Sequence, residues 1–279
     1  MNDSTRVGNA FLALSSGEIS QRVRFPALTI LSFCAFNAQS YSLHLFLDQS
    51  VHTDHDFLDV QRRKGCQIDL HDFDLLKVSE GTPLHSFLLS RWDYIANGPH
   101  FFSHRTDFFR TIALWKFGGW YIDHDVIFTS RLGRLQNVVH RQGFGLLNNA
   151  ISHFVQHHPF LESLMAFLRA SYSARDWNSA GPRALTRASK CWPAIDCSRA
   201  ECLNIAGREV FNPIPVTKHS FMFTEPVSKD FFSNLTASSV SIHCWNRVSK
   251  NYQIVSNSIV HRAIRAFSDF PDMERIQKD

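Results

Sequence analysis

The chain has 279 residues, of which 44% are hydrophobic, and its 29 lysines and arginines stand against 25 aspartates and glutamates. This length is sufficient for one substantial hydrophobic core, so a single domain is expected. The net charge of +4 is small, and no run of basic residues is long enough for a nucleic-acid-binding arm. No stretch reaches the roughly 18 apolar residues of a membrane-spanning helix, and the first residues lack the pattern of a signal peptide. We therefore expect a globular protein that does not bind nucleic acid.

Strand and helix patterns alternate along the chain. In the first half they predict a strand at 11–14, a core helix at 25–38, a strand at 43–47, a helix at 57–64, a strand at 66–70 and a helix at 83–97. The second half adds helices at 159–171 and 181–189 and short strands near Val210 and Val240. This alternation favours the α/β class, with a mostly parallel central sheet and helices on both faces. Ligands bind at the carboxyl ends of the strands in such sheets.

A further helix, which begins near residue 103, ends at a pair of glycines. Apolar residues recur at i, i+4 and i+7 from Phe108 to Trp115 and form one face of this helix. Asp107 and Arg110 lie three residues apart on a different face, close enough to pair. The glycines at 118–119 can adopt the left-handed conformation that ends a helix without steric strain.

Two carboxylates follow this helix. The apolar pattern at 120–128 predicts a mostly buried strand. Because side chains alternate along a strand, Asp123 and Asp125 point to one side and His124 points to the other. Paired carboxylates at such a position offer hard oxygen ligands to a divalent cation, Mn²⁺ or Mg²⁺. A cation held there can neutralise a diphosphate leaving group.

Two other D-x-D sequences, 54–56 and 72–74, compete with this one. Neither follows a helix that ends in glycine, and motifs this short often match by chance. We interpret both as solvated acidic surface and the first as a polar loop or helix start.

The segment from 103 to 128 resembles the core motif of DXD-type glycosyltransferases, in particular the α1,4-glycosyltransferase family of Gb3 synthase and α1,4-N-acetylglucosaminyltransferase. The family pattern corresponds here to Asp107, Arg110, the W-K-F-G-G sequence at 115–119, Tyr121 and the D-H-D sequence at 123–125. The resemblance extends over almost the whole chain through further ordered motifs at 81–84, 147–150, 181–187, 211–215 and 241–246. The sequence departs from the family pattern at Asn212, at Val216 and at 153–154, near the acceptor side.

The resemblance implies a GT-A-like nucleotide-diphospho-sugar transferase fold in one catalytic domain over 1–279. Residues from about 9 to 130 would bind the donor, and residues from about 131 to 265 would form the acceptor side and complete the metal site. The implied reaction is a retaining, metal-dependent transfer of galactose or N-acetylglucosamine from a UDP-sugar to a glycan or glycolipid, which forms an α1,4-type linkage. Members act in the Golgi lumen, in pathways such as glycosphingolipid biosynthesis. In the family, an N-terminal helix anchors the enzyme in the membrane. We expect no such anchor within the given sequence, and we expect membrane association only if the given sequence omits one.

The resemblance also assigns site residues. Asp123 and Asp125 are the expected catalytic residues, and together with His243 they are the expected metal ligands. The expected donor-binding residues are Asp107, Arg110, Tyr121, Asn148, Asn149 and Trp245. Structural alternatives stay open: an Asp107–Arg110 helix salt bridge without a ligand, asparagines that form a turn at a strand end, a buried hydrogen-bonded His243, and a Trp245 that only packs in the core. No protein base is required if the leaving phosphate oxygen takes the acceptor proton.

Two other functions compete with the transferase. One is a degenerate protein of the same fold that binds a sugar nucleotide without turnover. The other is a metal-dependent phosphoesterase, which would need more carboxylate or histidine ligands than the sequence offers.

The six cysteines do not have the spacing of a metal site. In an oxidising compartment Cys34 could pair with Cys66 and Cys191 with Cys202, and free buried thiols are the alternative.

Overall fold

The computed structural model describes residues 8–15, 18–19, 24–133, 135–192 and 202–267. Its centre is a seven-stranded sheet with the order β10-β8-β9-β6-β1-β3-β5. The strands in chain order are β1 (Gly8–Leu14), β3 (Tyr41–Leu47), β5 (Ile68–Asp72), β6 (Gly119–Ile122), β8 (Val138–Gly143), β9 (Leu146–Phe154) and β10 (Asn204–Ala206). β1, β3, β5 and β6 are parallel, and β9 runs antiparallel to both β6 and β8. The expected mostly parallel α/β sheet is confirmed.

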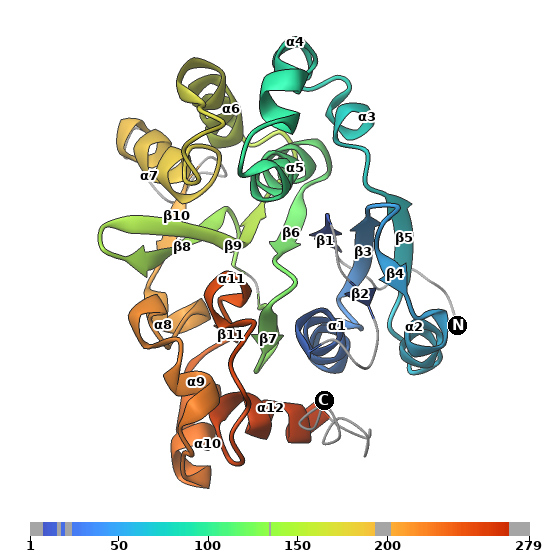
Figure 1. Ribbon diagram of the computed structural model, residues 1–279, viewed down its shortest axis with the longest axis vertical. Helices are drawn as coiled ribbons and strands as arrows, with labels where there is room; N and C mark the ends of the chain where they lie inside the picture. Colours follow the sequence, from blue (N-terminus) through green and yellow to red (C-terminus); the bar gives the residue numbers. More distant parts are fainter. Residues whose placement is uncertain (1–7, 16–17, 20–23, 134, 193–201, 268–279) are drawn as a thin grey trace.

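Helices cover both faces of this sheet (Figure 1). One face carries α1 (Arg24–Asn37) and α2 (His55–Arg63). The other face carries α3 (Leu75–Ser79), α4 (His85–Ala96), α5 (Phe101–Phe117), α6 (Pro159–Ser171) and α7 (Pro182–Cys191). Each layer has its own apolar core, with Phe33 and Leu45 on the first side and Phe108 and Phe160 on the second. Burial on both faces explains why the central strand β1 is almost continuously apolar from Ala10 to Leu14.

A C-terminal group of short elements lies beside the sheet (Figure 1). It contains α8 (Arg208–Phe211), the 3₁₀ turn η1 (Val216–Lys218), α9 (Phe221–Thr224), α10 (Lys229–Ser238), β11 (Ser241–His243), α11 (Asn246–Ser249) and α12 (Ile259–Phe267). Its apolar core includes Ile242, Met222 and Ile259 and joins α1 through Phe25 and Leu28. β11 pairs antiparallel with β7 (Val126–Phe128), and β2 (Glu18–Ile19) pairs with β4 (His52–Thr53).

Most of the predicted elements are present. The helices predicted at 25–38, 57–64, 83–97, 159–171 and 181–189 correspond to α1, α2, α4, α6 and α7, and the strands predicted at 11–14, 43–47 and 66–70 correspond to β1, β3 and β5. Asp54 and Asp74, from the two competing D-x-D sequences, are N-caps that accept hydrogen bonds from the amides of Phe57 and Lys77. Their carboxylates thus start helices at the surface, whereas a helix start was expected only for the sequence at 54–56.

Two strand predictions are wrong. Val210 lies in α8, where the Arg208 guanidinium donates to the carbonyls of Asn212 and Pro213 and closes one helical turn. The single strand predicted at 120–128 is two strands, because the chain leaves the main sheet at Asp123 and turns before β7 begins at Val126. β6 therefore belongs to the central sheet, and β7 belongs to a separate pair with β11.

The cysteine expectations are half right. Cys34 of α1 and Cys66, just before β5, form a disulfide. Cys191 is free and exposed, whereas Cys202 is disulfide-bonded, so the predicted pairing of these two residues is wrong. In the described ranges no helix has both the length and the hydropathy to cross a bilayer.

Candidate active site

The glycines after α5 fix where the carboxylates lie. Gly118 and Gly119 have φ of +66° and +98°, which turn the chain from α5 directly into β6. A Cβ atom on Gly119 would lie 2.3 Å from the carbonyl oxygen of Asn9 in β1. Only glycine permits this close approach of the two backbones together with a positive φ. β6 therefore runs beside β1 and delivers Asp123 to the carboxyl edge of the parallel strands.

The β7–β11 pair brings a histidine to the same point. His243 lies opposite Val126 in this antiparallel ladder, next to Asp125. Its Nε2 is 3.2 Å from Oδ1 of Asp125, and one ligand atom each from Asp123, Asp125 and His243 lies within 4.8 Å of the others. Asp125 and His243, which are 118 positions apart in sequence, thus lie in one cluster.

Asp125 and His243 are both almost fully buried, with 6% and 7% of their surfaces exposed. Oδ2 of Asp125 accepts a hydrogen bond of 2.7 Å from the backbone amide of Asn246. Burial by itself would raise the pKa of Asp125, but the neighbouring His243 imidazole holds that pKa well below its usual range. Burial likewise opposes the charge on His243, yet Asp125 raises the pKa of the imidazole overall. Asp125 is therefore a carboxylate at neutral pH.

Asp123 is held by groups on the other side of the cluster. Its Oδ1 accepts hydrogen bonds of 2.9 Å from both the Tyr121 hydroxyl and the Arg110 guanidinium. The guanidinium also lies over the Tyr121 ring, 4.6 Å from its centroid. The side chain of Asp123 keeps 20% of its surface exposed, so the cluster opens to solvent at this residue.

Arg110 connects this cluster to a third carboxylate. Its Nη2 is 3.4 Å from Oδ1 of Asp107, and the Asn149 side-chain amide donates to the same oxygen at 3.2 Å. Burial raises the pKa of Asp107 to about 6, with a contribution from Asp123 and against the opposing effect of Arg110. Gly181 lies against this carboxylate, since a Cβ atom there would be 2.7 Å from Oδ2. The backbone before α7 therefore closes tightly over Asp107.

The donor set fits a divalent cation. Two carboxylates and one imidazole are ligands that Mn²⁺ accepts, and Mg²⁺ accepts the oxygens. Ligand atoms of a six-coordinate ion lie about 3 to 4 Å apart at bond lengths near 2.1 Å, close to the spacing within this cluster. Asp107, Asp123 and Asp125 outnumber the single guanidinium of Arg110, so the local charge favours a cation.

The three other expected donor-binding residues are Asn148, Asn149 and Trp245, and they have different surroundings. Asn149 reaches Asp107, whereas the buried Asn148 donates to Oε1 of Gln142 and accepts from the amide of Ala150. Both asparagines lie inside β9 and not at a strand end, so successive side chains point to opposite faces. The Trp245 ring contacts the His243 ring at a tilt of 31°, with centroids 4.1 Å apart, and Trp245 has a φ of +56°.

Two residues of the site had no role in the sequence-based assignment. Asn246 binds Asp125 through its backbone and His124 through its side chain. Gly181 is required by the contact with Asp107 described above. Both lie in motifs that the resemblance includes, at 241–246 and 181–187, but their contacts depend on how distant segments meet.

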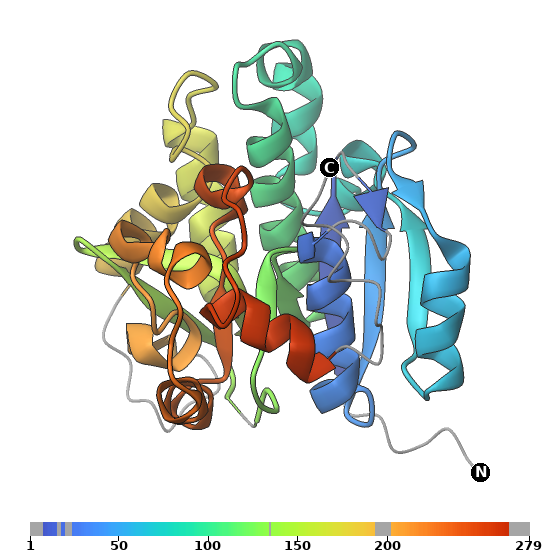
Figure 2. The ribbon, with the colours of Figure 1, turned by 60° about the horizontal axis from the view of Figure 1, so that its bottom comes forward.

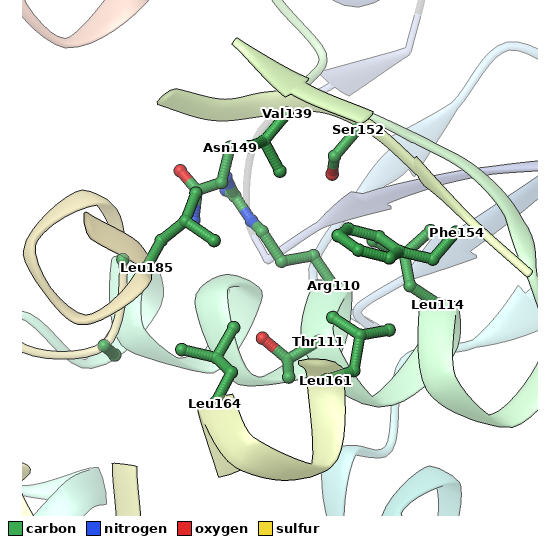
Figure 3. Close-up of a pocket in the computed structure, with 12 residues that line it drawn as sticks. Arg110, Thr111, Leu114, Val139, Asn149, Ser152, Phe154, Leu161, Leu164 and Leu185 are labelled. Atoms are coloured by element: carbon green, nitrogen blue, oxygen red, sulfur yellow. The ribbon is translucent and has the colours of Figure 1, made fainter. Parts of the chain in front are cut away.

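A small cavity lies behind Arg110 (Figure 3). Its volume is about 20 Å³, and its walls combine Arg110, Asn149 and Ser152 with leucines of α5, α6 and α7. This is room for about one water molecule, not for a sugar. The cavity borders the Arg110 side chain and is too small for a nucleotide sugar.

Two family models match the chain. The glycosyltransferase sugar-binding region containing the DXD motif matches residues 40–144, and the alpha 1,4-glycosyltransferase conserved region matches residues 153–267. The first contains Asp107, Arg110, Asp123 and Asp125, and the second contains His243.

Curated relatives agree with these models. Lactosylceramide 4-alpha-galactosyltransferase from Rattus norvegicus is 32% identical over 68% of this chain and 53% of that protein, and the one from Pongo pygmaeus is 30% identical over 68% of this chain and 88% of that protein. Alpha-1,4-N-acetylglucosaminyltransferase from Homo sapiens is 28% identical over 70% of this chain and 58% of that protein. The alignments thus cover about half the length of most of these relatives.

The fold agrees with a solved glycosyltransferase structure. The glycosyltransferase domain from the YGT toxin matches with a TM-score of 0.54 and 10% identity, over 97% of this chain and 96% of that domain. The α/β sheet with helices on both faces is the GT-A arrangement that the resemblance implied. With its matched family models, its relatives and this fold, the chain belongs to the α1,4-glycosyltransferase family, a family of DXD-containing transferases.

Proposed function

We propose that this protein is a metal-dependent, retaining glycosyltransferase that moves a hexose from a UDP-sugar to a glycan or glycolipid acceptor. The observation that carries this proposal is the cluster of Asp123, Asp125 and His243 beside the Asp107–Arg110 pair. Such an arrangement supplies both a cation site and a group that can bind hydroxyls or phosphate.

In this proposal, Asp123, Asp125 and His243 hold Mn²⁺ or Mg²⁺. The bound ion would neutralise the charge that develops on the leaving diphosphate. The amide of Asn246 and the hydroxyl of Tyr121 orient the two carboxylates, since each donates to one carboxylate oxygen. Orienting contacts of this kind keep metal ligands in place and tune their basicity.

Asp107, Arg110 and Asn149 are the proposed donor-binding group. Arg110 presents a planar array of donors, which suits the oxygens of a sugar or a phosphate. Its contact with both Asp107 and Asp123 fixes this array next to the cation site. Trp245 is a further proposed donor contact, because its indole lies on the imidazole of His243. Asn148 faces Gln142, and we propose for it a role in shaping β9.

We propose that no protein carboxylate acts as the nucleophile. Asp107 is 6% exposed and is occupied by Arg110 and Asn149, an arrangement that positions other groups. The acceptor hydroxyl would attack on the face from which the diphosphate leaves, and its proton would pass to the leaving phosphate oxygen. The anomeric configuration is then retained, and the new bond is α.

The donor is galactose or N-acetylglucosamine in this proposal, because relatives are named for transfer of each sugar. An α1,4-type linkage to a glycolipid or glycan follows from the same names. The Cys34–Cys66 disulfide supports an oxidising compartment such as the Golgi lumen, because disulfides are rare in reducing compartments.

A donor screen with UDP-galactose and UDP-N-acetylglucosamine, Mn²⁺ and lactose-type acceptors tests the proposal. We expect one donor to give product and Asp125→Ala to reduce Mn²⁺-stimulated turnover by about 10³-fold or more. Asp56→Ala is the matched control, because this aspartate belongs to a surface D-x-D sequence on α2. Full activity of Asp125→Ala would reject the assignment. Binding of UDP-sugar without hydrolysis or transfer would instead favour the degenerate, binding-only alternative.

A further inference from the structure

An exposed tryptophan lies close to the candidate active site. Trp177 is 37% exposed and belongs to the loop between α6 and α7. The guanidinium of Arg247 lies over its ring, 4.0 Å from the centroid. Figures 1 and 2 show α11, which contains Arg247, between the α6–α7 pair and the C-terminal elements α9 and α10. The contact thus joins two segments that are distant in sequence.

Hydrogen bonds fix the loop that carries Trp177. The fully buried imidazole of His104 donates through Nε2 to the carbonyl of Trp177 at 3.2 Å and accepts from the hydroxyl of Tyr172 at 2.9 Å. The Ser179 hydroxyl donates to the carbonyl of Ser173 at 2.6 Å. A loop fixed by this many bonds positions its exposed indole in one place, and exposed aromatic residues on fixed loops commonly bind ligands.

Both partners belong to segments that contact the active-site carboxylates. The loop of Trp177 ends at Gly181, which lies against Asp107. Arg247 follows Asn246, whose amide donates to Asp125. The tryptophan–arginine contact therefore joins the segment that lies against Asp107 to the segment that binds Asp125.

The chemistry of the pair matches a pyranose ring. One face of a hexose is made of C–H groups and packs on an aromatic ring, while its hydroxyls accept hydrogen bonds from a guanidinium. Among the described residues, Arg247 makes no hydrogen bond or ion pair, so its N–H groups are available to a ligand. A phosphate would use these donors but would gain nothing from the indole.

On these grounds we propose that Trp177 and Arg247 form the subsite that binds the terminal pyranose of the acceptor. This inference rests on the proposed transferase function. In it, the C–H face of the sugar packs on the part of the indole that the Arg247 guanidinium leaves uncovered, and Arg247 donates from the edge of the ring to the sugar hydroxyls.

The test is calorimetric binding of lactose and methyl β-galactoside in the presence of UDP and Mn²⁺. We expect Trp177→Ala to weaken sugar binding about tenfold or more, because it removes most of the apolar contact area. Trp177→Phe retains a ring and should stay within about threefold of the parent, and Arg247→Gln should weaken binding about three- to tenfold. UDP affinity should change by less than about twofold in all three variants. Phe231→Ala on α10 is the matched control, because Phe231 has a similar exposure of 42%.

Three results would overturn the subsite. They are unchanged sugar affinity in Trp177→Ala, a parallel loss of UDP affinity in that variant, and a parent protein that binds neither sugar. Failure of the proposed function looks different, because it appears as absent UDP-sugar hydrolysis and transfer by the parent. Thermal unfolding of Trp177→Ala shows whether the loop still packs. If that variant unfolds, Arg247→Gln decides the question, because unchanged sugar affinity in Arg247→Gln would also overturn the subsite.

Discussion

Arg110→Gln is the substitution that most directly tests how the active-site charges are balanced. Arg110 is 7% exposed and lies 2.9 Å from Asp123 and 3.4 Å from Asp107. Glutamine removes the charge and leaves two carboxylates facing each other, of which Asp107 is 6% exposed. Removal of one partner from a buried ion pair costs about 3 to 5 kcal/mol of unfolding free energy. We expect a loss in that range at pH 8.

The same variant should be less destabilised in acid. Burial already raises the pKa of Asp107 to about 6 in the parent, and Arg110 opposes that rise. The carboxyl of Asp107 in the unfolded chain has a pKa near 3.9, so between about pH 4 and 6 the folded protein binds a proton there that the unfolded chain has lost. The contribution of Asp107 to the free energy of unfolding therefore falls as pH rises through this range. Without Arg110 the folded pKa rises further, and each added unit costs about 1.4 kcal/mol at high pH. The penalty at pH 8 should exceed that at pH 5 by at least this amount.

Urea unfolding at pH 5 and pH 8, without added metal, measures both quantities. The double variant Arg110→Gln/Asp107→Asn should recover part of the unfolding free energy lost at pH 8, because buried residue 107 no longer carries a charge. Arg63→Gln is a suitable control, since Arg63 lies exposed at the end of α2 and its replacement should change stability by less than about 0.5 kcal/mol. A loss below about 1 kcal/mol, or equal losses at both pH values, would show that Arg110 does not balance a buried carboxylate.

Three further outcomes follow from the structure. Gly119→Ala should lower stability by about 3 kcal/mol or more in thermal or urea unfolding, because its Cβ would meet the carbonyl oxygen of Asn9 and its φ is +98°; a neutral effect would contradict the close approach of β6 to β1. Burial lowers the pKa of His140 to about 3, so this imidazole accepts a proton mainly in the unfolded chain. Its contribution to the free energy of unfolding should fall by about 2 kcal/mol as pH drops from 6.5 to 5, and His140→Gln should reduce the measured pH dependence by about that amount. Replacement of both Cys34 and Cys66 by alanine should lower the free energy of unfolding by about 3 to 4 kcal/mol under oxidising conditions, as expected for a cross-link over 32 positions. An unchanged urea midpoint would contradict this expectation.

Local patterns in the sequence were enough to predict most of the fold. A nearly continuous apolar stretch predicted the helix at 25–38, which is buried on almost all sides, and the sequence also predicted the helix at 159–171. The glycines at 118–119 marked the turn into β6, since no other residue type accepts that backbone. Family resemblance then selected one D-x-D sequence from three, and the other two proved to start helices.

Only the tertiary structure decided how the site is assembled. The sequence predicted one strand over 120–128, but pairing with the distant β11 separates β7 from the central sheet and places His243 beside Asp125. Local patterns also did not distinguish Asn148 from Asn149, whereas the pleat of β9 turns only the second toward Asp107. The physical reason is that a residue's own neighbours along the chain determine its backbone conformation. Its functional contacts depend on which remote segments the packed core brings together.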